Sequence, residues 1–215
     1  MNTNKKCRLV ILISGRGSNM QSIVETIKNK HLNAEVVAVI ANKADAKGIQ
    51  WAQEQGLATQ VLEHKSFIDR TSFDAHLAQL VQQYQPDYVL LAGFMRILTP
   101  EFVQQFTGRL INIHPSLLPL FPGLNTHQSA IDAQMQWHGC TVHFVTPVVD
   151  NGPIIAQGIV PVHHDDDAQR LAERLLATEH QVYNQVVEWL VSDQVHLLDS
   201  GRVQVQGVSH RAFIA

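Results

Sequence analysis

Residues 8–19 read Arg8-Leu-Val-Ile-Leu-Ile13 and then Ser14-Gly-Arg-Gly-Ser-Asn19, and this junction indicates the fold class. A continuous run of β-branched and aliphatic residues is typical of a strand buried on both faces of a sheet. After the glycine-rich turn, Met20, Ile23 and Ile27 recur at helical spacing. The order strand, turn, helix predicts the first unit of a parallel α/β sheet.

The rest of the first half repeats this alternation. The patterns predict strands at 35–41, 61–62, 87–92 and 109–113, and helices at about 44–55 and 73–84. Strands that alternate with helices imply right-handed crossovers and a mostly parallel sheet.

The second half changes character. Two predicted strands, 140–146 and 154–162, are separated only by the turn Asp150-Asn-Gly-Pro153, which favours antiparallel neighbours. A long amphipathic helix at about 166–191 and a small hairpin at about 195–207 follow. We therefore predict an α/β protein with an open, mostly parallel, doubly wound sheet and antiparallel additions in the second half.

Length and composition narrow the class of protein. The 215 residues suffice for one α/β domain, which we expect to span 1–215. With a formal net charge of −3, there is no excess of positive charge to bind nucleic acid or a membrane surface.

The cysteines and the N-terminus bear on the compartment. Cys7 and Cys140 are far apart and form no CxxC pair, so we expect reduced thiols and a cytoplasmic protein. The segment Met1 to Lys6 is polar, and the apolar run Leu9 to Ile13 is too short for a signal peptide or a membrane span.

The glycine loop 14–19 is a candidate anion site. At the carboxyl edge of a parallel sheet, free N–H groups at a helix start suit a phosphate. The alternative is a tight turn in which Ser18 or Asn19 caps the helix. A dinucleotide fingerprint needs a third glycine where Met20 stands, so a nicotinamide cofactor is disfavoured.

Three polar residues form a candidate catalytic set. Asn112 and His114 lie on the same face of the strand 109–113, where an amide and an imidazole can stabilise and protonate an oxyanion. Asp150 follows a later strand and opens a turn. A structural histidine and a turn-forming aspartate remain the alternatives unless the three residues meet.

These residues also carry a resemblance. The motif Asn112-Ile-His-Pro-Ser-Leu-Leu-Pro119, with Gly93-Phe-Met-Arg-Ile-Leu98 and Val142-His-Phe-Val-Thr146 leading to Asp150, resembles the folate-dependent formyltransferase family. Within that family, residues 14–19, 121–123 and Thr178-Glu-His180 are similar to the branch that acts on glycinamide ribonucleotide. The resemblance covers roughly 8–189.

The resemblance implies an activity. A Rossmann-like formyltransferase fold would move a formyl group from 10-formyltetrahydrofolate to the amine of glycinamide ribonucleotide, in purine biosynthesis and without a metal. We expect only these small-molecule partners and a monomer or weak homodimer. Residues 8–100 would form the phosphate-binding half, and 101–191 the folate-binding and catalytic half.

The resemblance also implies roles for single residues. His114 would act as general acid, Asn112 would bind the oxyanion, and Asp150 would orient His114 and relay a proton through water. The ribonucleotide would be bound by Gly17, Ser18, Asn19, Gly93, Ile113 and Glu179. The folate would be bound by Leu91, Met95, Arg96, Ile97, Leu98, Val145, Thr146, Pro147, Val148 and Val149.

Several points stay open from sequence. It is undecided whether Asn125, where the family commonly has a histidine, and His127 join the site. We interpret His163-His-Asp-Asp-Asp167 as a solvated loop whose aspartates cap the long helix, not as a metal site. A transfer-RNA formyltransferase, a formyltetrahydrofolate hydrolase and a noncatalytic binding module remain alternatives to the predicted activity.

Overall fold

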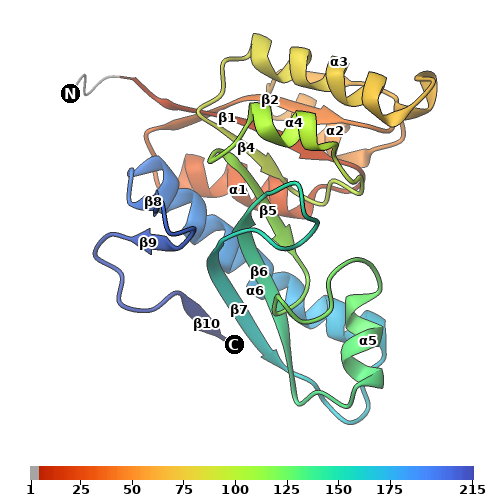
Figure 1. Ribbon diagram of the computed structural model, residues 1–215, viewed down its shortest axis with the longest axis vertical. Helices are drawn as coiled ribbons and strands as arrows, with labels where there is room; N and C mark the ends of the chain where they lie inside the picture. Colours follow the sequence, from red (N-terminus) through yellow and green to blue (C-terminus); the bar gives the residue numbers. More distant parts are fainter. Residues whose placement is uncertain (1–4) are drawn as a thin grey trace. The chain divides into compact units, whose positions relative to one another are not determined.

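A computed structural model describes residues 5–215, which belong to two compact units, Met1–Ile111 and Asn112–Ala215 (Figure 1). Met1 to Asn4, part of the polar segment interpreted above, lie outside the described residues. The prediction of one domain over 1–215 stays a prediction, and each unit is described by itself.

The first unit is built on parallel strands. Its strands pair in the order β4-β1-β2-β3. They are β1 (Cys7–Ile13), β2 (Ala34–Ala41), β3 (Thr59–Val61) and β4 (Tyr88–Leu91). The helices are α1 (Ser18–Asn29), α2 (Lys47–Glu54), α3 (Arg70–Gln83) and α4 (Pro100–Gln105), with a 3₁₀ turn η1 (His64–Ser66).

Burial explains why the strands of the first unit could be predicted from the sequence. Leu9 to Ile13 of β1 are completely buried, as expected for a strand covered on both faces. The start of α2 lies against the glycine loop, where the Gly48 N–H donates to the Gly15 carbonyl at 3.0 Å. A Cβ on Gly48 would lie 2.6 Å from Ile13 Cδ1 and 3.0 Å from the Arg16 carbonyl oxygen, so a larger residue would force the Ile13 side chain to shift.

The second unit contains antiparallel pairs. Strand β5 (Leu110–His114) enters it from the first unit along the chain. Strand β6 (Trp137–Phe144) pairs antiparallel with β7 (Ile154–Pro161), and β10 (Ala212–Ile214) pairs parallel with β7. Strands β8 (Val195–Leu197) and β9 (Val203–Val205) form the predicted hairpin. The helices are α5 (Thr126–Asp132) and α6 (Ala168–Val191).

Close packing joins α6 to the strands of this unit. The helix contacts β6 and β7. A Cβ on Gly158 would lie 2.4 Å from Thr178 Cγ2 and 2.8 Å from Val182 Cγ2, so the glycine lets the helix rest on β7. The apolar stripe predicted for 166–191 is this contact surface, with Leu171, Leu175, Val182 and Val186 buried.

The predicted α/β fold class, with antiparallel additions in the second half, is confirmed. Helices α4 and α5 and strand β10 were not predicted, and α2 and α6 begin later than the patterns indicated. The start of α4 had a readable signal, since Thr99 caps the helix and Pro100 occupies its first position. In α5 only Thr126 and Ala130 are buried, so it shows no apolar period.

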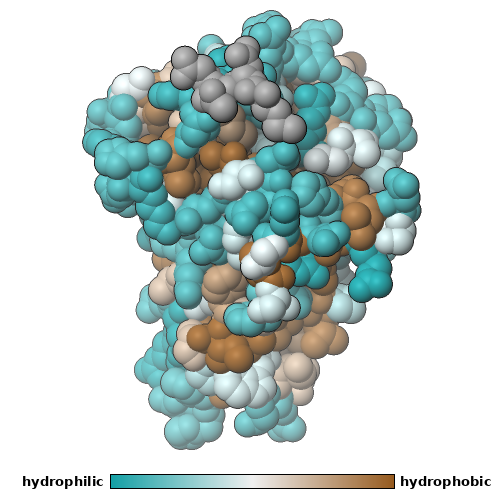
Figure 2. All heavy atoms as spheres, turned by 90° about the vertical axis from the view of Figure 1, so that its left-hand side faces the viewer, coloured by the Kyte–Doolittle hydropathy of each residue, from teal (hydrophilic) through white to brown (hydrophobic). Residues whose placement is uncertain are grey.

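One face of the molecule is of mixed polarity. Figure 2 shows a face on which hydrophilic residues surround separate groups of hydrophobic ones, an ordinary arrangement for a folded domain. Within residues 5–215, none of the helices has the length and apolar character needed to cross a membrane.

Candidate active site

The three candidate catalytic residues lie in the second unit, and two of them are in direct contact. His114 ends β5 and is buried, and its Nδ1 lies 3.5 Å from Asp150 Oδ2. Asn112 precedes it by two residues on the same strand, as the alternation predicted. The side chains of His114 and Asp150 are 7% and 11% exposed, so water screens their interaction only weakly.

The Asp150 carboxylate is held by the backbone. Its Oδ2 accepts a 2.8 Å hydrogen bond from the Gly123 N–H. Asp150 itself has φ of 50°, a left-handed conformation that aspartate tolerates better than most residues. The predicted turn at Asp150 therefore exists, and it directs the carboxylate toward His114.

Both ring nitrogens of His114 face oxygen atoms. Nε2 lies 3.0 Å from the Phe121 carbonyl, and Nδ1 faces Asp150. A neutral imidazole has one N–H and can donate to only one of them, whereas an imidazolium donates to both. The surroundings of His114 therefore suit a ring that carries positive charge.

A residue that we did not predict orients Asn112. His143 Nδ1 lies 2.9 Å from the Phe144 carbonyl and must donate to it, so Nε2 is left as an acceptor. Asn112 Nδ2 donates to that nitrogen at 3.3 Å. Burial lowers the pKa of His143, which keeps this ring neutral. A polar residue within the quoted motif 142–146 was the available signal.

A buried polar network supports the loop after His114. Thr141 Oγ1 donates to the Ser116 carbonyl at 2.7 Å and accepts from the Leu118 N–H at 3.0 Å. Gln157 Nε2 donates to the Leu118 carbonyl and to Thr141 Oγ1, both at 3.0 Å. Strands β6 and β7 thus fix the backbone of 116–118.

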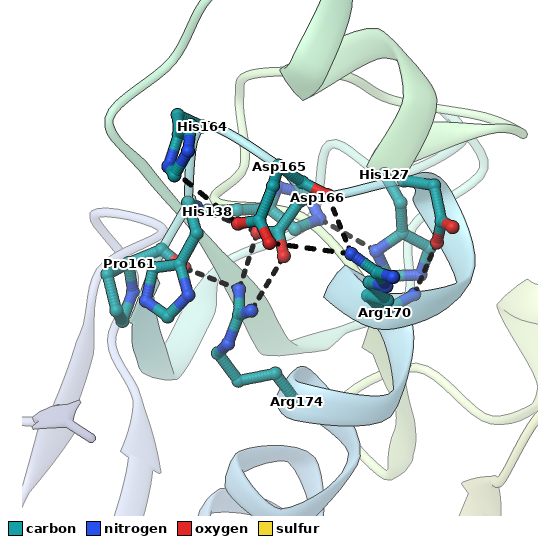
Figure 3. Close-up of polar contacts among 10 residues, drawn as sticks. His127, His138, Pro161, His164, Asp165, Asp166, Arg170 and Arg174 are labelled. Atoms are coloured by element: carbon teal, nitrogen blue, oxygen red, sulfur yellow. Dashed lines mark hydrogen bonds and ion pairs between the residues drawn. The ribbon is translucent and has the colours of Figure 1, made fainter.

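His127 pairs with another histidine. Its Nδ1 lies 3.1 Å from His138 Nε2 (Figure 3). Burial, together with the neighbouring His127, lowers the pKa of His138 to about 4, and burial lowers that of His127 as well. Among the described residues, this pair has no carboxylate contact like that of His114 with Asp150.

The candidate phosphate loop belongs to the first unit. Gly17 precedes α1 with φ of 70°, and no side chain within residues 5–215 caps the helix. The alternative in which Ser18 or Asn19 is the cap is therefore wrong, because both residues lie inside α1. The twelve-residue helix directs its first N–H groups toward this glycine turn, an arrangement that suits an anion.

The segment 91–98 also belongs to the first unit. Leu91 and Leu98 are buried, whereas Met95 and Ile97 are 69% and 52% exposed. Gly93 has φ of 74°. The Arg96 side chain is mostly buried against α3, so it is not an ordinary surface arginine.

The remaining candidates lie in the second unit. Ile113 is buried in β5, and Glu179 is half-buried on α6. In the candidate folate loop, Thr146 Oγ1 donates to the Val148 carbonyl at 3.1 Å, while Pro147, Val148 and Val149 are exposed. Val145 is half-buried.

The loop 163–167 has its polar groups engaged. Arg174 binds Asp166 through two contacts of 2.6 and 2.7 Å, and Asp167 accepts from the Arg170 N–H at 2.8 Å (Figure 3). The prediction that an aspartate caps the long helix is confirmed at Asp167. Ligand atoms of His163, Asp165 and Asp166 lie within 4.8 Å of one another, but Asp166 is already committed to Arg174.

Comparisons with known proteins identify the family of this chain. A family model described as formyl transferase matches residues 7–187. The phosphoribosylglycinamide formyltransferase of Escherichia coli (strain K12) is 43% identical over 205 residues, which are 93% of this chain and 97% of that protein.

Solved structures are similar as well. A phosphoribosylglycinamide formyltransferase from Coxiella burnetii, in complex with CHES, has a TM-score of 0.90 and 40% identity, covering 97% of this chain and 99% of that one. A formyltetrahydrofolate deformylase from Pseudomonas syringae has a TM-score of 0.86 and 26% identity, covering 93% of this chain and 66% of that one. The resemblance predicted from the motifs is confirmed.

Proposed function

The chain belongs to the formyl transferase family, and we propose that it transfers the formyl group of 10-formyltetrahydrofolate to the amine of glycinamide ribonucleotide. The products are formylglycinamide ribonucleotide and tetrahydrofolate, in de novo purine biosynthesis. The observation that carries the proposal is the contact between buried His114 and Asp150, with Asn112 on the same strand. Similarity over nearly the full length of the Escherichia coli enzyme supports it.

Asn112 binds the oxyanion. The amine attacks the formyl carbon, and the formyl oxygen gains negative charge in a tetrahedral intermediate. One N–H of the Asn112 amide is taken by His143, and the other has no partner among residues 5–215. That N–H can donate to the oxyanion, and because His143 fixes the amide in advance, little reorganisation is needed.

His114 is the general acid. Its Nδ1 faces Asp150 at 3.5 Å, and its Nε2 lies 3.0 Å from the Phe121 carbonyl, so Nε2 donates to a substrate only when that contact opens. The attacking amine must lose a proton, and the departing folate nitrogen must gain one. Asp150 stabilises the His114 imidazolium and accepts the proton of the attacking amine through a water molecule. The pair of His114 and Asp150 then gives one proton to the departing folate nitrogen.

The ribonucleotide is bound through its phosphate and ribose. Gly17, Ser18 and Asn19 bind the phosphate, because they lie at the start of α1, where the N-terminal end of the helix dipole favours an anion. The Glu179 carboxylate accepts hydrogen bonds from the ribose hydroxyls. Gly93 and Ile113 complete this part of the site.

The folate is bound by two segments. The exposed apolar side chains of Met95, Ile97, Val148 and Val149 offer contact to the pterin ring. The N–H groups of Ile97 and Leu98 have no partner among the described residues, so they can bind the pterin edge. Leu91, Arg96, Val145, Thr146 and Pro147 support these segments. The enzyme acts in the cytoplasm as a monomer or weak homodimer.

Hydrolysis of formyltetrahydrofolate is the second candidate, because a deformylase shares the fold at 26% identity. The chain is 43% identical to the Escherichia coli transferase but 26% identical to that deformylase, which favours transfer. The test is to incubate purified protein with 10-formyltetrahydrofolate, with and without glycinamide ribonucleotide. Folate consumption only with the amine supports transfer. Consumption without the amine supports hydrolysis, and no consumption in either case contradicts both.

A further inference from the structure

The loop 94–99 has an alternating arrangement of side chains. Phe94 and Leu98 are buried in the core, and Arg96 is turned inward between them. Met95 and Ile97 are directed outward and exposed. The loop therefore presents two apolar side chains, and its conformation depends on what holds the inward residues.

A buried carboxylate on α3 holds one end of this loop. Asp74 Oδ2 accepts a 2.6 Å hydrogen bond from the Thr99 N–H, and Asp74 Oδ1 lies 3.8 Å from Arg96 Nε. The Arg96 guanidinium lies over the Phe73 ring, 4.4 Å from its centroid. The Asp74 side chain is 1% exposed, and a buried carboxylate is costly unless it is paired.

A second tie holds the other end. The Met95 N–H donates to Ser14 Oγ at 2.8 Å, and Ser14 donates to Asn42 Oδ1 at 2.6 Å. Both ends of the loop are thus bound to buried polar side chains. The N–H groups of Ile97 and Leu98 lie between the two ties.

We infer that Asp74 is a positioning residue for the folate: through the Thr99 N–H and Arg96, it keeps loop 94–99 in the conformation that binds the pterin. The inference rests on the proposed function, because it takes this loop as part of the folate site. Asp74 acts on the loop backbone and on Arg96. Its removal should therefore weaken folate binding without changing the chemical step or the binding of the ribonucleotide.

The variant Asp74→Asn tests this with almost no change in side-chain volume: it removes the charge that faces Arg96, while its amide oxygen can still accept from the Thr99 N–H. The dissociation constant of tetrahydrofolate, measured by calorimetry, and the KM for 10-formyltetrahydrofolate should each rise about ten-fold, equivalent to about 1.4 kcal/mol. The kcat and the KM for the ribonucleotide should stay within about two-fold. The matched control is Asp69→Asn, since Asp69 caps the same helix from an exposed position and asparagine caps equally well.

A thermal melt separates this role from a merely structural one. If folded Asp74→Asn melts earlier but binds tetrahydrofolate as the wild type does, Asp74 only stabilises the fold and the inference is wrong. If the wild type itself fails to bind tetrahydrofolate, the proposed function fails and the inference fails with it. Normal binding by the wild type and by Asp74→Asn overturns the inference alone.

The partner variant Arg96→Met provides a second test, and the single variant remains available if Asp74→Asn does not fold. Because Asp74 acts partly through Arg96, each single variant should lose folate affinity, and the double variant should lose less than the product of the two losses. Unchanged folate affinity in Arg96→Met, or losses that multiply fully in the double variant, would overturn the role of Arg96 in this coupling.

Discussion

Two histidine sites of the second unit differ in their partners. His114 faces the carboxylate of Asp150 and the carbonyl of Phe121. His127 faces His138, a second imidazole. All of these rings are buried or partly buried, so depth alone does not distinguish the two sites.

The difference determines what each site can do with a proton. Acceptor oxygens on both sides of His114 compensate a positive charge on its ring. At the other pair a proton would bring two imidazoles together without a counter-charge, and the pKa of His138 is lowered to about 4. We therefore expect proton transfer at His114 and neutral, structural rings at His127 and His138.

The largest effect should follow from removing the first ring. We expect His114→Ala to lower kcat by about 10²–10⁴, the usual contribution of one positioned acid–base group, while both ligands still bind. Steady-state kinetics with calorimetry check this. His196→Ala, which removes an exposed histidine of β8, is the control and should change kcat less than about two-fold. Turnover at the wild-type rate in His114→Ala would remove that residue from the mechanism.

The pair of His127 and His138 should have an intermediate effect, which concerns the stability of the fold and not the rate of the reaction. The pKa of His138 in the folded protein, about 4, lies below its ordinary value of 6.5. Between these values the unfolded chain binds more protons, so stability falls as the pH drops from about 6.5 to about 4, by at most about 3 kcal/mol. Urea unfolding of the wild type and of His138→Gln at pH 7.5 and 4.5 measures this contribution. If the variant loses as much stability between pH 7.5 and 4.5 as the wild type does, His138 is not the source of this pH dependence.

The smallest effect should come from His127→Gln. Glutamine can still hydrogen-bond to His138, and no carboxylate contact is lost, so kcat at pH 7.5 should change less than about three-fold. The same assay decides whether His127 joins the site, which the resemblance left open. A fall in kcat of a hundred-fold or more would place His127 in the mechanism, and the proposed difference between His127 and His114 would then be wrong.

The sequence predicted the elements that have strong apolar periods. The run Arg8 to Ile13 and the stripe along 166–191 correspond to β1 and α6 because burial of those side chains forms the elements. Helix α5 buries only two residues, and β10 has three residues at the edge of its sheet, so neither leaves a pattern in the sequence.

The candidate site was predictable to a similar extent. Alternation along β5 placed Asn112 and His114 on one face, but only the fold brings Asp150, far along the chain, within 3.5 Å of His114. His143 and Asp74 were not predicted, since a polar residue in a strand or helix does not reveal whether it is buried. His143 pairs with Asn112, which lies 31 positions away along the chain, and Asp74 pairs with Thr99, which lies 25 positions away.

The most direct test of the account is single-turnover formyl transfer by Asp150→Asn across pH, together with equilibrium binding of both ligands. Asparagine keeps the size of the side chain and an oxygen that accepts from the Gly123 N–H, but it removes the charge that faces His114. We expect the rate of the chemical step to fall by about 10²–10⁴, with both affinities nearly unchanged. A variant that binds folate poorly but reacts normally once it is bound would contradict the account and make Asp150 a folate-binding residue.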